Sequence, residues 1–257
     1  MKALQIAASG MMAQQRNTEI VANNLANMNT TGYQRRRTEF ADLAYANFER
    51  KDSASSRAGD TVPGGIDSGL GVRVAAAYRV HEQGSLSSTS NTFDMAIQGE
   101  GFFQVLLPNG DTAYTRDGTF QLNGQGELVT HDGFAIQPAI QIPDGAIDVT
   151  INATGEILVQ EAGQKAPTNA GTLQIATFPN QAGLEALGDN LFRETSASGT
   201  ANVDKPGAAG FGSVLQGFVE TSNVNPIEEV ANLIRAQRAY EMNSKVIATA
   251  DQMMATK

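Results

Sequence analysis

Mainly apolar residues recur at alternating steps of three and four along the first part of the chain, from Leu4 to Met28, with polar residues at two of the eight places. This stretch contains no proline and a single glycine, Gly10, so it predicts one continuous helix. A sustained three-four alternation is the heptad pattern of a coiled coil. We expect the helix to end near Gly32, because glycine suits a left-handed C-terminal cap. The repeat falls at Leu4, Ala7, Met11, Gln14, Thr18, Val21, Leu25 and Met28.

The last part of the chain shows the same pattern. Asn225 predicts a helix cap, Pro226 the first turn, and Glu228 follows three residues after the cap. Partly polar seams like these two gain most by packing against copies of themselves. The alternative, two ordinary amphipathic helices on a globular core, is disfavoured by their place at the extreme ends of the chain. The second repeat falls at Val230, Leu233, Gln237, Tyr240, Ser244, Ile247, Asp251 and Met254.

Between the two helical stretches, short runs rich in valine, isoleucine, phenylalanine and threonine predict β-strands, as in Phe102–Leu106. Turn dipeptides separate these runs and are typical of hairpins. The fold class is therefore α+β, with N- and C-terminal helices paired as a coiled coil and a central antiparallel β domain. The dipeptides are Asn109-Gly110, Asp117-Gly118, Asn123-Gly124 and Asp132-Gly133.

This pattern divides the chain into three regions. Residues 1–32 and 219–257 form a discontinuous terminal-helix domain, and residues 71–218 form the β-rich domain. Residues 33–70 form an extended linker or long loop, in which Arg50–Gly69 is polar, charged and rich in serine and glycine. We expect the linker to have an interaction role in an assembly.

Composition narrows the classes of function. The net charge of −9 and the pI of about 4.7 disfavour nucleic acid and anionic membrane surfaces as partners. There is no cysteine, so disulfides and thiolate metal sites are excluded. No apolar run approaches the roughly 20 residues of a membrane span, and the start of the chain lacks the features of a cleaved secretory signal.

No pattern of catalytic, cofactor-binding or metal-binding residues stands out. His81-Glu82 lacks the helical spacing of a zinc motif, and an exposed position at the end of a strand is the default for both His81 and His131. The basic run Arg35–Arg37 predicts either a solvated face or salt bridges in an assembly. We therefore expect no enzyme activity, no cofactor and no metal.

Several motifs resemble those of bacterial flagellar rod and hook proteins. They cover nearly the whole chain, and the paired terminal motifs are highly specific. The length, the loop after the first helix and Gln216–Glu220 favour the distal rod within this family. The motifs are Ser9–Ala13, Asn23–Asn27, Thr31–Tyr33, Ile97–Phe103, Tyr114–Gly118, Glu220–Asn225, Gln237–Glu241 and Asn243–Lys245.

The resemblance implies a helical homopolymer: a tubular drive shaft in the flagellar basal body that crosses the periplasm and transmits torque from motor to hook. Implied partners are other copies, other axial rod and hook proteins, the surrounding basal-body rings and the flagellar export apparatus. Export would proceed without a cleaved signal peptide.

The remaining alternatives are a proximal-rod or hook subunit, a secreted β-rich binding module and a hydrolase with an unrecognised site. If the chain does polymerise, the apolar positions of the two helical repeats become its expected assembly contacts. They are Leu4, Met11, Val21, Leu25, Met28, Val230, Leu233, Tyr240, Ile247 and Met254.

Overall fold

The computed structural model describes residues 2–47, 67–143, 145–161, 163 and 166–255. Most of the predicted loop Arg50–Gly69 lies outside these ranges. The chain divides into two compact units. The helix unit comprises Met1–Ala26, Arg36–Tyr78 and Asn225–Lys257, and the β unit comprises Asn27–Arg35 and Arg79–Val224.

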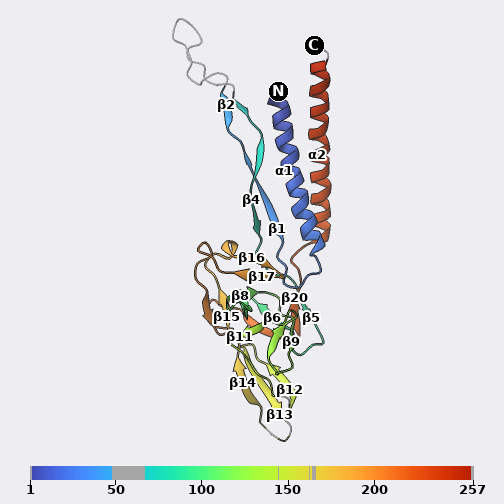
Figure 1. The fold of residues 1–257 in the computed structure, drawn as a ribbon. Helices are drawn as coiled ribbons and strands as arrows, with labels where there is room; N and C mark the ends of the chain where they lie inside the picture. Colours follow the sequence, from blue (N-terminus) through green and yellow to red (C-terminus); the bar gives the residue numbers. More distant parts are fainter. Residues whose placement is uncertain (1, 48–66, 144, 162, 164–165, 256–257) are drawn as a thin grey trace. The chain divides into compact units, whose positions relative to one another are not determined.

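The two terminal helices pack against each other in the helix unit, as the sequence predicts. Helix α1 spans Lys2–Ala26 and α2 spans Pro226–Ala255. Figure 1 shows them side by side and antiparallel, with both chain termini at the same end of the pair. At Gly10 of α1 the side chain of Asn243 from α2 comes close enough to meet a Cβ placed there.

A narrow antiparallel ribbon completes the helix unit. It pairs β1 (Arg36–Asp42) with β4 (Val72–Arg79), and β2 (Tyr45–Asn47) with β3 (Asp67–Gly69). The sequence-based division assigned much of this stretch to an extended linker, whereas the structure groups 36–78 with the helices. Hydrogen bonds from side chains of α1 also join this stretch to the helix.

Three polar side chains of α1 make these contacts. The Asn24 amide exchanges two hydrogen bonds with the Arg36 backbone, at 2.8 and 2.9 Å. Farther along, the Asn17 carbonyl oxygen accepts a hydrogen bond from the Thr38 hydroxyl, and the Ser9 hydroxyl accepts one from the Val72 amide. The ribbon is therefore fixed along α1 by hydrogen bonds.

The β unit is built on a 9-stranded sheet in which every described pairing is antiparallel. Its path runs β16-β17-β8-β7-β11-β10-β9, and β15 pairs with both β7 and β18. The strands are β7 (Phe102–Leu106), β8 (Thr112–Thr115), β9 (Phe120–Leu122), β10 (Leu128–Thr130), β11 (Ala135–Gln137), β15 (Ile175–Thr177), β16 (Glu185–Gly188), β17 (Leu191–Arg193) and β18 (Asn202–Asp204).

Smaller sheets surround the main one. A three-stranded sheet follows the order β12-β13-β14, while β6 pairs with β19 and β5 pairs with β20. A short 3-10 helix spans Gln181–Gly183. The bounds are β5 (Leu86–Ser88), β6 (Met95–Gln98), β12 (Ala146–Ile151), β13 (Glu156–Glu161), β14 (Thr168–Thr172), β19 (Ser213–Gln216) and β20 (Phe218–Glu220).

The core of the β unit is aliphatic and aromatic. Phe103 and Phe120 are fully buried and meet edge to face, with ring centroids 5.1 Å apart. A second cluster gathers Phe102, Phe178 and Phe192 around similar edge-to-face contacts. Such pairs stabilise a fold beyond the apolar area that they bury.

Three of the four predicted hairpin turns connect paired strands. Asn109-Gly110 joins β7 to β8, Asn123-Gly124 joins β9 to β10, and Asp132-Gly133 joins β10 to β11. The prediction for Asp117-Gly118 is wrong, because β8 and β9 do not pair. A Cβ at Gly118 would overlap the Met95 carbonyl oxygen, so this glycine permits a close backbone approach instead.

Of the helices in the described part of the chain, none combines the length and apolar character that crossing a bilayer requires.

Candidate assembly surface and buried junction

Small residues make up most of the buried apolar positions of α1 and α2. Ala7 and Ala13 of α1 are buried, as are Ala236 and Ala250 of α2. Alanine side chains let two helix backbones approach closely. On α2 the buried or half-buried positions Glu229, Ala236, Asn243 and Ala250 are spaced seven residues apart, which is a heptad interval.

The ten predicted assembly residues fall into different environments in the single chain. Val21 is buried in the helix pair, and Met28 lies beyond the end of α1 in the β unit. Which of the ten contact another copy stays a prediction. Leu4, Met11, Leu25, Leu233 and Ile247 are half-buried, whereas Met28, Val230, Tyr240 and Met254 are exposed.

Helix α2 carries a second apolar stripe that the heptad pattern did not identify. Ile234 lies two residues before the buried Ala236, about 200° around the helix, so it faces away from the seam. Exposed large apolar residues on one face of a helix mark a surface that another chain can cover. We call these residues the α2 stripe: Ile227, Ile234, Met242, Val246 and Met253, which are 83%, 46%, 61%, 48% and 64% exposed.

The start of α2 forms as its sequence predicts. The Asn225 side-chain oxygen accepts a hydrogen bond from the Ile227 amide at 3.1 Å, and its backbone carbonyl accepts one from Glu229 at 3.0 Å. These bonds satisfy amide groups that a helix start leaves without helical partners. Asn225 is therefore the N-cap.

A buried ion pair lies in the β unit where segments from distant parts of the sequence meet. Arg116 Nε and Glu220 Oε2 are 3.0 Å apart, without hydrogen-bond geometry, and both side chains are less than 10% exposed. Arg116 Nη1 donates to the carbonyl oxygens of Gly99 and Gly101 at 2.8 and 2.7 Å. Glu220 Oε1 accepts a hydrogen bond from the Gly84 amide at 3.0 Å.

Burial and mutual attraction act in opposite directions on this pair. Burial raises the pKa of Glu220 and lowers the pKa of Arg116, and in each case the charge of the partner opposes the effect. Removing one partner would therefore leave the other as a buried charge that its surroundings disfavour.

Asn223, three residues after Glu220, forms hydrogen bonds with both stretches of chain that make up the β unit. Its side-chain oxygen accepts from the Arg35 amide at 2.7 Å, and its Nδ2 donates to the carbonyls of Val80 and Glu82, both at 2.9 Å. The Gly32 amide donates to the Glu220 carbonyl at 2.8 Å. Residues 31–35, 80–85 and 218–223 are thus bonded together, and we call them the three-segment junction.

His81 belongs to this junction, and the expectation of an exposed histidine is wrong for it. Both ring nitrogens are buried and neither makes a hydrogen bond. Burial, reinforced by the charges of Arg79 and Arg116, lowers the pKa of His81 to about 4. The ring is therefore neutral at pH 7. His131, by contrast, is about half exposed, and its Nε2 lies 3.2 Å from Asp132 Oδ2.

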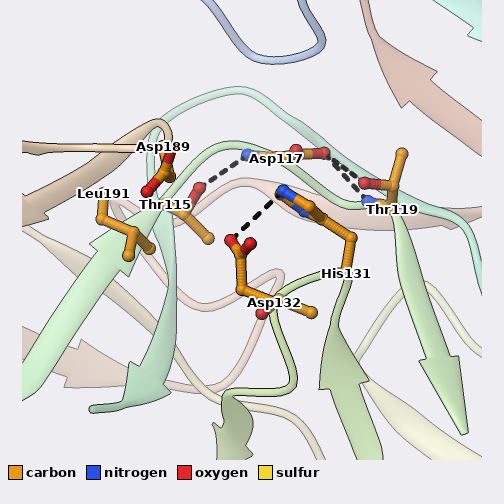
Figure 2. A pocket seen from close by; sticks show the side chains of 8 residues that line it. Thr115, Asp117, Thr119, His131, Asp132, Asp189 and Leu191 are labelled. Atoms are coloured by element: carbon orange, nitrogen blue, oxygen red, sulfur yellow. Dashed lines mark hydrogen bonds and ion pairs between the residues drawn. The ribbon is translucent and has the colours of Figure 1, made fainter.

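A small cavity near β8 gathers polar side chains but has little room (Figure 2). Its volume is about 10 Å³, the size of one water molecule. The Asp117 carboxylate accepts hydrogen bonds from the Thr119 amide and hydroxyl, and burial raises its pKa. These bonds hold a turn in place, and the cavity cannot admit a substrate.

The described residues also form no candidate metal site. Across the described ranges, no group of three or more histidine, cysteine, aspartate or glutamate side chains could hold a metal ion.

Pattern reasoning missed Arg116, Glu220 and Asn223 as structural residues. Each lies within a motif whose pattern in the sequence indicates a family resemblance and no structural role. A charged residue directly after a strand of buried character, as Arg116 follows Tyr114-Thr115, was the available signal. The partner, 104 positions farther along the chain by residue number, could not be identified from spacing.

Three protein-family models match separate parts of the chain. The model described as "Flagella basal body rod protein" matches residues 4–34. "Flagellar hook protein FlgE/F/G D1 domain" matches residues 96–159, and "Flagellar basal body rod FlgEFG protein C-terminal" matches residues 215–256. The matched segments include both terminal helices and the middle of the β unit.

Relatives in several bacteria match over almost the full length. A Caulobacter vibrioides protein described as "Flagellar basal-body rod protein FlgG" is 53% identical over 254 residues, covering 99% of this chain and 97% of the relative. Proteins with the same description from Agrobacterium fabrum and Bacillus subtilis are 50% and 36% identical, over 98% and 99% of this chain and 97% of each relative.

Proposed function

Because the chain belongs to the flagellar basal-body rod protein family, we propose that it is a structural subunit of the distal rod, the drive shaft that transmits torque from motor to hook. The full-length similarity to rod proteins is the observation that carries this proposal. The chain is a structural protein rather than an enzyme, in keeping with the descriptions of its relatives.

In this proposal the subunits polymerise through their terminal helices. The α2 stripe supports the idea, because its apolar side chains are exposed in one chain and would be buried against a second copy. The heptad interval along the α1–α2 seam favours coiled-coil packing of the pair. The nine predicted contacts that lie on the two helices would then act together with the α2 stripe in assembly.

Further partners follow from a place in the rod. They are other axial rod and hook proteins, the surrounding basal-body rings and the flagellar export apparatus. The rod would cross the periplasm as part of the basal body, and the subunit would reach it without a cleaved signal peptide.

Electron microscopy of concentrated purified protein tests assembly directly, with straight tubes as the expected result. Ile234→Asp should prevent tube formation, because it places a charge in the middle of the α2 stripe. Ala248→Asp is the matched control, since Ala248 is exposed on the same helix and belongs neither to the stripe nor to the ten predicted contacts. Equal loss of tubes in both variants would contradict a specific role for the stripe.

A Caulobacter vibrioides strain from which the related rod protein has been deleted tests where this chain lies in the flagellum. This chain should restore swimming, and a tag on it should mark the distal part of the rod in isolated basal bodies. A tag confined to the proximal part of the rod or to the hook would overturn the distal assignment.

A further inference from the structure

The chain crosses from one unit to the other at four points, and each of them lies at or near the three-segment junction. The chain passes between units after Ala26, Arg35, Tyr78 and Val224. These points lie at or within a few residues of segments 31–35, 80–85 and 218–223. Any force that travels along the chain from the helix unit therefore enters the β unit at the junction.

Bonds between backbone groups also join the junction's segments. The Gly32 amide bonds to the Glu220 carbonyl, Val80 bonds to Arg35, and Thr221 bonds to Ser85, at 2.8, 2.9 and 2.8 Å. These bonds hold the segments to one another.

Arg116 links the junction to the 9-stranded sheet, since it follows β8 directly in the sequence. Its guanidinium contacts the Glu220 carboxylate on one side and the carbonyls of Gly99 and Gly101 on the other. A planar guanidinium donates in fixed directions, so several simultaneous contacts define its orientation.

We propose that Arg116 is a positioning residue that anchors the three-segment junction to the 9-stranded sheet, so that torque from the terminal helices enters the β unit through the Arg116–Glu220 ion pair. This inference rests on the proposed function, because only a rod subunit carries torque.

The chemistry of the pair fits anchoring better than stabilisation. Desolvating two charges offsets much of their attraction, so apolar residues of similar size often give equal or greater stability. The ion pair differs from apolar packing in requiring two particular groups to stay close, since moving the carboxylate away leaves two buried charges without each other. It therefore resists displacement of the junction relative to the sheet.

Hydrogen exchange on the purified full-length chain tests the anchor. Glu220→Gln keeps the side-chain shape and an acceptor for Gly84 but removes the charge. We expect exchange at the Gly32, Gly84 and Thr221 amides to become at least tenfold faster, with the amides of β7 and β8 unchanged. Glu185→Gln is the matched control, because it removes an exposed pair with Arg193 (2.7 Å) in the same sheet.

Two results would overturn the anchoring role. Unchanged exchange at the junction would show that the pair is dispensable there, and equal acceleration in β7 and β8 would make it a general part of the core. If Glu220→Gln does not fold, a double variant that combines Arg116→Met with Glu220→Met removes both charges together. Hydrogen exchange at the same amides is then measured on that variant. Failure of this paired variant to fold would also assign the pair to the core and overturn the proposal.

Swimming under load tests the torque path. Caulobacter vibrioides cells complemented with Glu220→Gln should form rods in normal number. Their swimming speed should be normal in dilute medium and should fall by at least half in viscous medium. Glu185→Gln should match the wild-type chain in both. Equal performance of Glu220→Gln and wild type under load would refute the torque path. Absence of rods with the wild-type chain would instead refute the proposed function, while the exchange result would still decide the anchor.

Discussion

The two units of this chain bury apolar residues in opposite ways. The β unit places large side chains such as Phe103, Phe120 and Ile157 where they are fully buried. The helix unit buries mainly alanine and leaves large side chains such as Ile234 and Met242 exposed. A fold is stabilised roughly in proportion to the apolar area that it removes from water.

This difference indicates that the two units depend on other copies to different extents. The β unit completes its core within one chain, so it should fold and melt independently. The helix unit keeps much of its apolar surface at the protein's exterior, so most of its stability should come with polymerisation. The predictions that follow separate these two behaviours.

The largest effect is expected in the core of the β unit. Phe103→Ala should lower the free energy of unfolding by about 3–5 kcal/mol, because it removes a fully buried ring and leaves a cavity. Thermal unfolding of the monomer followed by near-ultraviolet circular dichroism measures this. Ile147→Ala in β12, where the side chain is 72% exposed, should change it by less than about 0.5 kcal/mol.

A smaller effect, confined to assembly, is expected at the helices. Leu25→Ala or Ile247→Ala should weaken the polymer by about 2–3 kcal/mol per subunit, if these half-buried side chains become fully buried between copies. Sedimentation gives the critical concentration for assembly, while the melting of the β unit should not change. A lower melting temperature for the β unit would mean that Leu25 belongs to that core instead.

A pH effect should come from the β unit through His81. Its pKa of about 4 lies below the ordinary 6.5, so between these values the unfolded chain binds a proton that the folded chain does not. The contribution of His81 to the free energy of unfolding is therefore fully present above pH 6.5. It is lost as the pH is lowered towards 4, which reduces the free energy of unfolding by about 1–2 kcal/mol because the ring is partly accessible to solvent.

Denaturant unfolding at several pH values checks this against His81→Gln. Subtracting the two curves removes the contribution of carboxylates such as Glu220 and Asp117, which both proteins contain. A wild-type curve parallel to that of His81→Gln would contradict the effect.

The smallest effect is expected at the start of α2. Asn225→Ala removes the N-cap hydrogen bond to the Ile227 amide and should destabilise the helix by about 1 kcal/mol. Amide exchange in the first turn of α2 should become faster while the sheet amides stay as protected as before. Asn225→Asp retains an acceptor and should restore the protection.

Local chemistry in the sequence was enough to predict both helices, the cap at Asn225 and the turns at Asn109-Gly110, Asn123-Gly124 and Asp132-Gly133. Each of these features depends on residues within a few positions of one another. The packing of the two helices against each other was also predictable, because both carry the same repeat and neither closes an apolar core alone.

Tertiary structure alone decided the ribbon along α1, the close approach at Gly118 and the pairing of Arg116 with Glu220. These contacts join residues far apart in the sequence, and no local periodicity specifies such a partner. The same holds for the burial of His81, whose neighbours in the sequence predict an exposed strand end. Local propensity determined which elements form, whereas long-range packing determined which polar side chains they enclose.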